Sequence, residues 1–524
     1  MIGKLARRVT PDSPLDRTMR SSFVLFACAG LGLALLMCGS DDEGAGAGPS
    51  GGPDGGASSS SGNGSSGTGS SSGSSGNTDS GPIAGPKRPT FDSQKTLPQV
   101  LRVVALAGGG WGVLTQQVTQ TTSIDGKSLE PGGPILLKLG ANGTIQWAKT
   151  LATGGGSQNG PARLATDDVG NLYVSGLTYT VTVDFGDGVS VPTGNSNTQV
   201  AFVGQIDGNG TAKWLQLVYS SQGLWDIQVA ARNGKVAVGG SYSPYLQLTY
   251  VATDGAKLAP YLTRDSHDTA YLLQLNASDG KANWIQLYGA KGDEPNAYAQ
   301  IHDVAIDATG EITVGGTYAK GPLIDMAQTA FTTPLDAGFV MKVDDAGARK
   351  WVRAFENAGL EHIVADGTRV IASGSNKGDV DFGGGVRKGP AFFTVALDPA
   401  TGTTTADRTF GGGGTDMFAM ANDPAGGTVL GFVVPAATAG GQIDNVTLPV
   451  ESSAFVAKLG TDGKAQWVES FVRPEAGTPV VAPYALAVDP SGKVLLGGAI
   501  GTSSHDFGGG AIASPNGFLV WYAP

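Results

Sequence analysis

Residues 454–467 read AFVAKLGTDGKAQW, and residues 489–498 read DPSGKVLLGG. The first stretch is an apolar strand, a turn and a second strand that reaches Trp467. The second stretch is a turn followed by a short strand that ends in glycine. Asp and Gly between two apolar runs are typical of β-hairpins, because Asp bonds to the turn backbone and Gly accepts a positive φ. We call these patterns the Trp half and the turn half of one repeating unit.

Both halves recur along the chain. The Trp half ends at Trp147, Trp214, Trp284, Trp351 and Trp467, and a degenerate copy that starts at Ala391 has Ala406 in place of the Trp. The turn half ends at Gly176, Gly240, Gly316, Gly374, Phe432 and Gly498. Successive Trp residues are 67, 70, 67 and 116 residues apart, the last step covering two units. Units of about sixty residues with four short strands match the blades of a propeller better than the coils of a solenoid.

The two ends of the repeat region predict how the fold closes. Residues 101–120 align with a turn half, whereas 518–522 align with the first strand of a Trp half. Partial halves at opposite ends predict a last blade that both termini complete, which leaves no free sheet edge. We therefore expect an all-β fold, a seven-bladed β-propeller over residues 96–524. Its apolar runs do not alternate strictly with polar residues, so we expect strands that are buried on both faces.

The N-terminal region has the composition of an export signal followed by a tether. An apolar run at 23–37 follows four arginines, and its 15 residues are fewer than the ~20 that a membrane span needs. We assign residues 1–37 to a signal peptide of the lipoprotein type. Residues 38–95 are rich in Gly and Ser and contain too few apolar side chains for a core, so we expect a disordered tether.

Both cysteines, Cys28 and Cys38, lie in this N-terminal region. The body of the chain therefore has no disulfide, no cysteine-based zinc site and no thiol nucleophile. Leu35-Leu36-Met37 before Cys38 resembles a bacterial lipobox, although Met37 stands where Gly, Ala or Ser is usual. The resemblance implies lipid attachment at Cys38, and the alternative is a signal with two incidental cysteines. The acidic residues early in the segment leave Met19 as an alternative translation start.

Units of the form AFVAKL-x-DG-xx-W, then ALAVDPSGKVLLGG and then HDFGGG, resemble the bacterial SBBP-type β-propeller repeat over essentially all of 96–524. The resemblance implies an exported cell-surface protein or lipoprotein with a binding or structural role. A role in envelope assembly, like that of the lipoprotein propeller of the outer-membrane barrel machinery, is a related hypothesis. The Trp pattern is also similar to the tryptophan-docking repeat of pyrroloquinoline-quinone dehydrogenases. Those enzymes carry a vicinal Cys pair, which this body lacks.

Composition limits the partners of the protein. Of 524 residues, 83 are Gly and only 15% are charged, with a net charge of -11. An acidic balance without a basic block in the body argues against nucleic-acid binding. The content of apolar residues, 40%, argues against a chain that is disordered throughout.

The body contains no motif that assembles a catalytic set, so we assign no catalytic residue, cofactor or metal site. The four histidines, none at the spacing of a zinc site, are His267, His302, His362 and His505. His302-Asp303 and His505-Asp506 suggest acid–base chemistry, which needs positioned partners. The DFGDG or DFGGG loops at 184–188, 381–385 and 506–510 lack calcium-loop spacing, so we expect strand ends followed by glycine turns. We expect the repeated Trp residues to pack between blades rather than stack on a ligand.

The sequence thus predicts an extracytoplasmic, lipid-anchored propeller that acts as a binding or scaffold surface at the cell envelope, on the outer membrane or cell surface. The expected partners are the membrane, through the lipid, and an unidentified envelope protein or polysaccharide. Loops on one face, such as 241–268 and 317–336, are expected to form the binding surface. The alternative is a propeller enzyme, a hydrolase, lyase or oxidoreductase, in which titratable side chains converge in the central channel.

Overall fold

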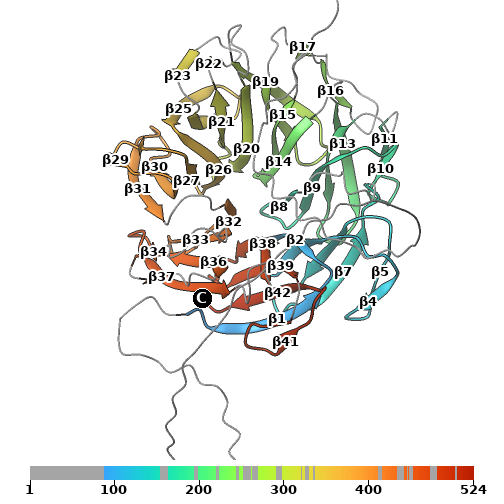
Figure 1. Cartoon of the computed structure of the whole chain (residues 1–524). Coiled ribbons are helices and arrows are strands. Elements are labelled where there is room, and N and C mark those ends of the chain that lie inside the picture. The colour runs from blue at the N-terminus through green and yellow to red at the C-terminus, as the bar shows by residue number, and fades with distance from the viewer. Residues whose placement is uncertain are drawn as a thin grey trace, which may run out of the picture. The chain divides into compact units, whose positions relative to one another are not determined.

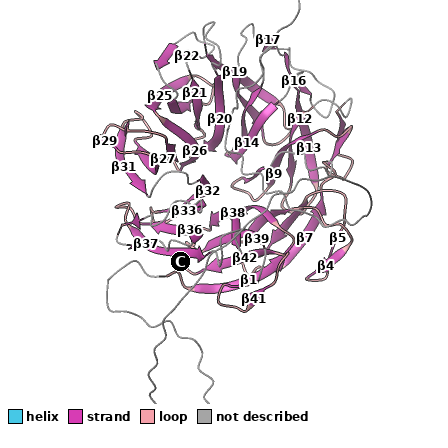
Figure 2. Cartoon of the chain, viewed as in Figure 1, coloured by secondary structure: helices cyan, strands magenta, loops and turns pink. Residues whose placement is uncertain are grey.

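The computed structural model describes the following residues: 88–153, 163–193, 199–219, 224–242, 247–251, 261–262, 269–290, 298–319, 321–324, 330–333, 337–410, 416–433, 442–444, 446–447, 452–472, 481–501 and 504–524. The predicted signal peptide, Cys38 and most of the predicted tether lie outside these ranges. All regular secondary structure within them is β-strand (Figure 2). No helix in these ranges is long and apolar enough to cross a membrane.

Seven antiparallel blades, which we number I to VII in chain order, are arranged in a ring (Figure 1). We call the axis that their first strands surround the channel. The innermost strands are β2 (Val100–Ala105), β8 (Arg163–Thr166), β14 (Leu224–Arg232), β20 (Tyr298–Ile306), β26 (Ala358–Ala365), β32 (Asp416–Asn422) and β38 (Val481–Val488). The second strands are β3 (Trp111–Thr115), β9 (Leu172–Thr178), β15 (Lys235–Tyr242), β21 (Ile312–Ala319), β27 (Val370–Asn376), β33 (Thr428–Val433) and β39 (Val494–Ile500).

The outer half of each blade corresponds to the Trp half of the repeat. The third strands are β6 (Ile135–Leu139), β12 (Val200–Ile206), β18 (Thr269–Asn276), β24 (Ala337–Val343), β30 (Ala391–Leu397), β36 (Ser452–Leu459) and β42 (Gly517–Tyr522). The outermost strands are β7 (Ile145–Thr150), β13 (Ala212–Tyr219), β19 (Ala282–Ala290), β25 (Arg349–Glu356), β31 (Thr404–Phe410), β37 (Ala465–Val472) and, in blade VII, β1 (Phe91–Leu97). All residues of β9, β12 and β24 are buried, as expected for strands covered on both faces.

A short two-stranded ribbon joins the second and third strands of every blade. The ribbons are β4 (Thr122–Ile124) with β5 (Lys127–Leu129), β10 (Thr182–Asp184) with β11 (Ser190–Pro192), β16 (Gln247–Val251) with β17 (Tyr261–Leu262), β22 (Gly321–Ile324) with β23 (Ala330–Thr333), β28 (Val380–Asp381) with β29 (Val386–Arg387), β34 (Gln442–Ile443) with β35 (Val446–Thr447), and β40 (His505–Asp506) with β41 (Ala511–Ile512).

The described parts of 241–268 and 317–336 differ from the loops that the sequence predicts. They form the ribbons β16–β17 and β22–β23, and these pair with the outermost strands β13 and β19 of the preceding blades. The two segments therefore widen two sheets at their outer edges. Consecutive strands in a blade are antiparallel, so each second strand begins at the short turn that joins it to the first strand and ends on the opposite face of the propeller. The two segments therefore start on the face opposite these short turns.

Blade VII is closed by both ends of the described chain, which confirms the prediction. β1 pairs antiparallel with β42 from Phe91 opposite Tyr522 to Leu97 opposite Gly517. β1 begins at Phe91, inside the range 38–95 that the sequence assigns to the tether. Leu97 is also buried in an apolar cluster that joins blade VII to blade I, so the strand contributes to the core as well as to the sheet.

The same ionic clasp reinforces several seams between blades. A ribbon Asp with a left-handed φ near 50° pairs with a cation on the outermost strand of the preceding blade and accepts a hydrogen bond from a backbone N–H of its own blade. The pairs are Lys95–Asp125 at 2.5 Å, Lys149–Asp187 at 2.5 Å and Arg408–Asp444, and the N–H donors are those of Ile145, Ala212 and Ala465. Lys95 lies on β1, so the closing seam uses the same contact as the others.

The repeated Trp residues pack between blades, as expected. The Nε1 of Trp214 donates to the carbonyl of Ala277 in the outer hairpin turn of the next blade, at 2.8 Å, and a Cβ on Gly280 of that turn would lie 2.6 Å from the ring. Trp147, Trp284 and Trp351 make the same bond to Gly208, Asp345 and Pro399. In blade V, where Ala406 replaces the Trp, Arg408 still donates to the carbonyl of Gly463, as Lys149 and Arg353 do to Gly210 and Gly402 beside the Trp bond in blades I and IV. Thus every one of these turns is held by a donor from the neighbouring blade.

The repeated Gly-Gly of the turn half reflects close packing on two sides. A Cβ on Gly315 would lie 2.6 Å from a side-chain carbon of Ile363 in the next blade. A Cβ on Gly316 would overlap the carbonyl oxygen of Gln300 on the innermost strand of the same blade. The pair therefore lets the innermost strands approach one another around the channel. Phe432 at the matching place in blade VI is buried and packs on Phe392 and Phe455, at ring distances of 4.8 and 4.7 Å.

Alanine substitution of two glycines at the ends of equivalent turns measures how much the contact with Trp214 constrains the turn. Gly280 has a φ of 68° and lies against Trp214, whereas Gly463 has a φ of 72° with no atom within 4 Å of a built Cβ. Alanine at either position meets the left-handed backbone penalty of ~1 kcal/mol. We expect Gly280→Ala to lower the free energy of unfolding by a further ~1–3 kcal/mol, because the ring must move. Urea unfolding of both variants tests this, and equal losses would contradict it.

Candidate functional site

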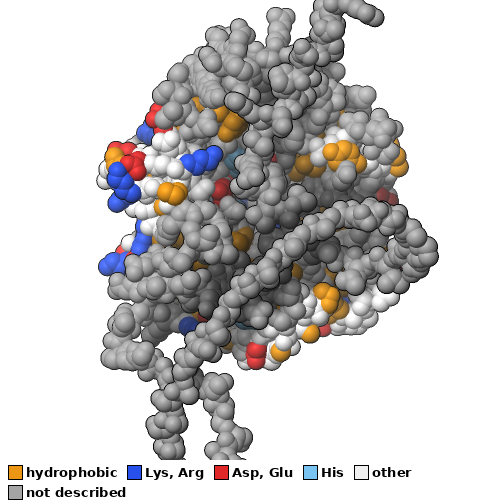
Figure 3. Space-filling view, viewed as in Figure 1, with side chains coloured by type: hydrophobic (Ala, Val, Ile, Leu, Met, Phe, Trp, Pro, Cys, Tyr) orange, Lys and Arg blue, Asp and Glu red, His pale blue; other side chains and the backbone are white. Residues whose placement is uncertain are grey.

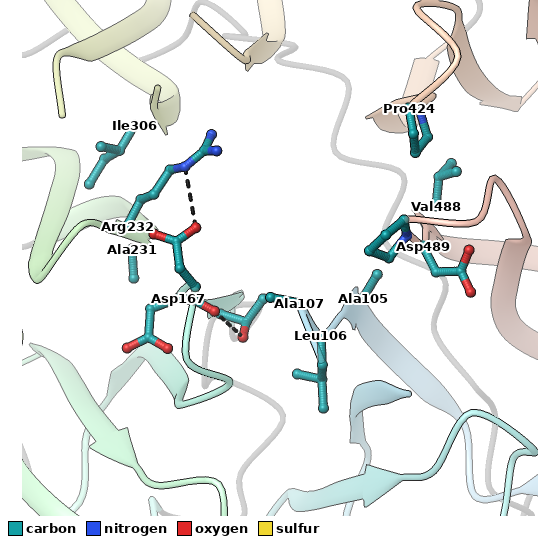
Figure 4. Close-up of a pocket in the computed structure, with 13 residues that line it drawn as sticks. Ala105, Leu106, Ala107, Asp167, Ala231, Arg232, Ile306, Pro424, Val488 and Asp489 are labelled. Carbon is teal, nitrogen blue, oxygen red and sulfur yellow. Dashed lines mark hydrogen bonds and ion pairs between the residues drawn. The ribbon is translucent and has the colours of Figure 1, made fainter. Parts of the chain in front are cut away.

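One mouth of the channel holds a recess of about 500 Å³. It is lined by the ends of innermost strands and by the turns that follow them, in six of the seven blades (Figure 4). Arg232 and Ile306 lie on one side, and Pro424, Val488 and Asp489 lie on the other. The lining is therefore made of short hairpins rather than of long loops.

The carboxylates at this mouth are committed to holding the turns. Asp167 accepts backbone bonds from Val169 and Asn171, at 3.1 and 2.8 Å, and a bond from the hydroxyl of Tyr173 at 2.9 Å. Asp489 caps its own turn in the same way, through the backbone N–H groups of Ser491 and Lys493 at 2.8 and 3.0 Å. The Asp-x-x-Gly turns thus behave as predicted from sequence, and they give the mouth a fixed shape.

A third carboxylate at the mouth links two blades. Asp168 pairs with the guanidinium of Arg232 at 3.4 Å and accepts the backbone N–H of Asn233 at 3.0 Å (Figure 4). The side chains of Asp168 and Arg232 remain 49% and 32% exposed. This pair is the most accessible charged feature that the structure describes in the recess lining.

Three residues below the lining, the innermost strands carry a ring of side chains at one register position. The set, which we call the channel ring, comprises Arg102, Arg163, Gln228, Asp303, His362, Ala419 and Ala485, one residue from each of blades I to VII. Three strand residues correspond to about 10 Å of depth. The ring is polar in blades I to V and consists of alanine in blades VI and VII.

Blades II, III and IV are joined through Asp226. Arg163 donates to Gln228 at 2.7 Å and lies 3.6 Å from Asp226, and the amide of Gln228 donates to Asp226 at 2.9 Å. His302 approaches the same carboxylate at 3.9 Å through Nδ1, and its Nε2 lies 2.9 Å from the hydroxyl of Thr317. Burial opposes the charge on Asp226, but His302, Arg163 and Gln228 outweigh it and hold the pKa of that carboxyl below its usual value.

Blades IV and V are joined through Asp303. This carboxylate accepts the backbone N–H of Ile363 at 2.9 Å and lies 3.8 Å from Nδ1 of His362. The Nε2 of His362 donates to the carbonyl of Met417 in blade VI at 3.1 Å. Burial favours the neutral ring, but the contacts with Asp303, the charge of Glu361 and the Met417 carbonyl outweigh it and raise the pKa of His362. Each of these two histidines therefore takes its carboxylate from the preceding blade, and the neighbours His302 and Asp303 are not partners.

Other sequence-predicted positions have structural roles. Asp381 and Asp506 of the DFGGG loops each accept two backbone N–H bonds from the glycines that follow, and Asp184 accepts one from Gly186. His505 packs edge-on against Phe507 at 4.6 Å. His267 lies outside the described residues. Among the described side chains, no group of three or more His, Cys, Asp or Glu is arranged to hold a metal ion.

Two buried lysines on third strands have structural roles that the sequence did not predict. Lys342 is 2.8 Å from both Asp307 and Glu311, and Lys458 is 3.1 Å from Asp423. Burial opposes the charge on Lys342, but its two carboxylates outweigh it and raise the pKa of that amine. Asp307 and Asp423 belong to the mouth turns, so these lysines fasten the turns to the blades. The signal was present in the repeat, since both lysines stand two residues before the turn that precedes a Trp.

Charge on the surface is mixed. On the face shown in Figure 3, basic side chains of the described residues lie beside acidic ones rather than in one extended basic patch.

Comparisons with known proteins add no family. No family model matches the chain, and no curated protein matches it. The solved structures that align with it include BamB from Moraxella catarrhalis (12% identity, 83% of this chain and 99% of that chain, TM-score 0.37) and the quinohemoprotein alcohol dehydrogenase from Comamonas testosteroni (12%, 82% and 76%, TM-score 0.37). A leech intramolecular trans-sialidase aligns with a TM-score of 0.30 at 10% identity, over 80% of this chain and 67% of that chain. With TM-scores below 0.5, these likenesses carry no inference about function, and the fold rests on the strand pairing itself.

The contact between His362 and Asp303 predicts a pH-dependent stability. Because the folded-state pKa of His362 is raised, its stabilising contribution is complete below the unfolded histidine pKa of ~6.5 and is lost as pH rises through the higher folded value. We expect His362→Gln to lower the melting temperature more at pH 6 than at pH 8.5. Thermal unfolding of the variant and the parent across this range measures the difference.

His505→Gln is the control with the opposite sign. Burial lowers the pKa of His505, so its protonation opposes folding at acid pH and the substitution removes that penalty. The loss from His505→Gln should therefore shrink, or become a gain, as pH falls. A loss at His362→Gln that is independent of pH would contradict the assignment.

Proposed function

We propose that this protein is an exported, lipid-anchored β-propeller that serves as a binding or scaffold surface at the cell envelope. The observation that carries the binding role is the channel mouth, a recess of about 500 Å³ built from six blades. Its Asp-capped turns give it a fixed shape, and pre-formed concave sites bind at a low entropic cost. The partner is an envelope protein or a polysaccharide, and the SBBP-type resemblance of the repeats supports an envelope location. A role in envelope assembly is one form of this proposal.

The same mouth supports a binding role over catalysis. Asp167 and Asp489 accept several turn bonds each, so neither has the freedom of a general acid or base. Titratable groups do converge in the channel, which keeps the alternative of a propeller enzyme with a channel site. However, both ring nitrogens of His302 and of His362 already face partners in the wall. These contacts favour a structural use of the two histidines.

The anchor predicts that Cys38→Ala releases the protein from membranes. We expect the parent and the Cys28→Ala control to incorporate labelled palmitate and to partition into a detergent phase, because an acyl chain adds ~0.8 kcal/mol per buried methylene. Cys38→Ala should lose the label and appear in the aqueous fraction. If Cys38→Ala remains with the membranes through a detergent wash, the anchor at this residue is wrong.

If the channel mouth binds the partner, a bulky side chain placed in the mouth should reduce partner binding. Ala107 is exposed in the recess lining, and Ala107→Trp should obstruct it. We expect this variant to recover about tenfold less partner from solubilised envelopes, as for loss of an interface anchor. Val386→Trp is the matched control, since Val386 is 60% exposed on the ribbon β28–β29 and does not line the recess. Quantitative mass spectrometry of both pull-downs decides the matter, and equal recovery would place the binding surface elsewhere.

A further inference from the structure

The positive charge in the channel ring is not balanced evenly. Arg163 is paired with Asp226 and Gln228, and Asp303 is engaged by His362 and the backbone of Ile363. Arg102, by contrast, makes a hydrogen bond to the carbonyl of its own neighbour, Leu101, at 2.6 Å. Among the described residues, no carboxylate lies within ion-pair distance of Arg102. The ring therefore holds one guanidinium without an acidic partner, beside a second on the adjacent blade.

The environment of Arg102 opposes its charge. Burial and the repulsion of Arg163 lower the pKa of Arg102 to about 9, and the more distant attractions of Asp226 and Asp303 only partly offset this. Two arginines at one register position on adjacent strands thus repel each other in a confined channel. An oxygen anion placed between them would remove that repulsion, and a guanidinium offers parallel N–H donors that suit such an anion.

The ring positions on the other side of Arg102 carry small side chains. Going round the ring, Arg102 lies between Arg163 of blade II and Ala485 of blade VII, and Ala419 of blade VI comes next. The recess lies directly above, lined on this side by Ala105 and its neighbours. Water reaches this level of the channel, since about a quarter of the side chain of Arg163 is exposed. A ligand entering from the mouth therefore meets small side chains on one side and the two guanidinium groups on the other.

From this arrangement we propose that Arg102 and Arg163 bind the carboxylate or phosphate group of a small anionic ligand inside the channel. The recess of about 500 Å³ accommodates the rest of the ligand. This site goes beyond the binding surface at the mouth and does not depend on the lipid anchor. Its failure would leave the Cys38 and Ala107 predictions intact, and their failure would leave this site intact.

The test uses the full chain in detergent, with sodium benzoate and inorganic phosphate as separate probes at constant ionic strength. We expect at least one probe to bind saturably by calorimetry and to raise the melting temperature in a concentration-dependent way. The probe that binds more tightly identifies the carboxylate or the phosphate as the preferred group. Absence of saturable binding by both probes would overturn the proposal.

Variants assign the site to the two arginines. Arg102→Gln and Arg163→Gln should each weaken binding by about tenfold or more, because each removes a charge-assisted donor pair. Arg353→Gln is the control, since Arg353 lies on the outermost strand β25 and donates to the carbonyls of Gly402 and Thr401. Arg102→Lys keeps the positive charge but loses the two parallel N–H donors of the guanidinium. If Arg102→Gln fails to fold, Arg102→Lys serves as the test, and we expect it to bind the probe measurably more weakly than the parent. Binding by the arginine variants that equals that of the parent would overturn the assignment.

Discussion

The pairing of β1 with β42 is the constraint on which the rest of the structure depends. A propeller blade is a four-stranded sheet. If the last blade lacks a strand, one of its strands has an unpaired edge, and this edge is covered only when the blade is complete. Here the first described strand of the chain supplies the outermost strand of the last blade. The pairing covers the outer edge of β42, and Leu97 adds to the apolar cluster that joins blade VII to blade I.

The seams show that a repeat can tolerate the loss of its most prominent residue. Four Trp residues bond across a seam to the next outer turn, and at the closing seam Trp521 lies against Gly143, although Trp521 is on a third strand rather than an outermost one. Between blades V and VI the indole is missing, and Arg408 keeps the second contact of the seam, at the turn glycine that Lys149 and Arg353 reach in the equivalent turns. This seam therefore retains one donor to the turn of the neighbouring blade without the aromatic ring.

The repeats predicted most of the fold, whereas the channel could not be predicted from them. Period, turn chemistry and the partial halves indicated seven blades and their closure, and they located the departures at Ala406 and Phe432. β1 escaped detection because an outermost strand pairs through its backbone, and FDSQKTL has no apolar signature of a Trp half. The sequence neighbours His302 and Asp303 suggested a pair. In the structure a bulge lies at this point of β20, and each side chain finds its partner on a different adjacent blade. These partners are 59 and 76 residues away in the sequence, and no local pattern encodes them.

The place where the chain enters the propeller also has a mechanical consequence. The polypeptide that precedes Phe91 continues directly into β1, so a pull on the N-terminal region reaches the strand that completes the ring. A force along β1 loads the ladder from Phe91 to Leu97 in shear, together with the clasp between Lys95 and Asp125 and the burial of Leu97. A force across β1 would break the same bonds one after another. The resistance of blade VII to such a force is thus governed by the rate at which this one strand detaches from β42.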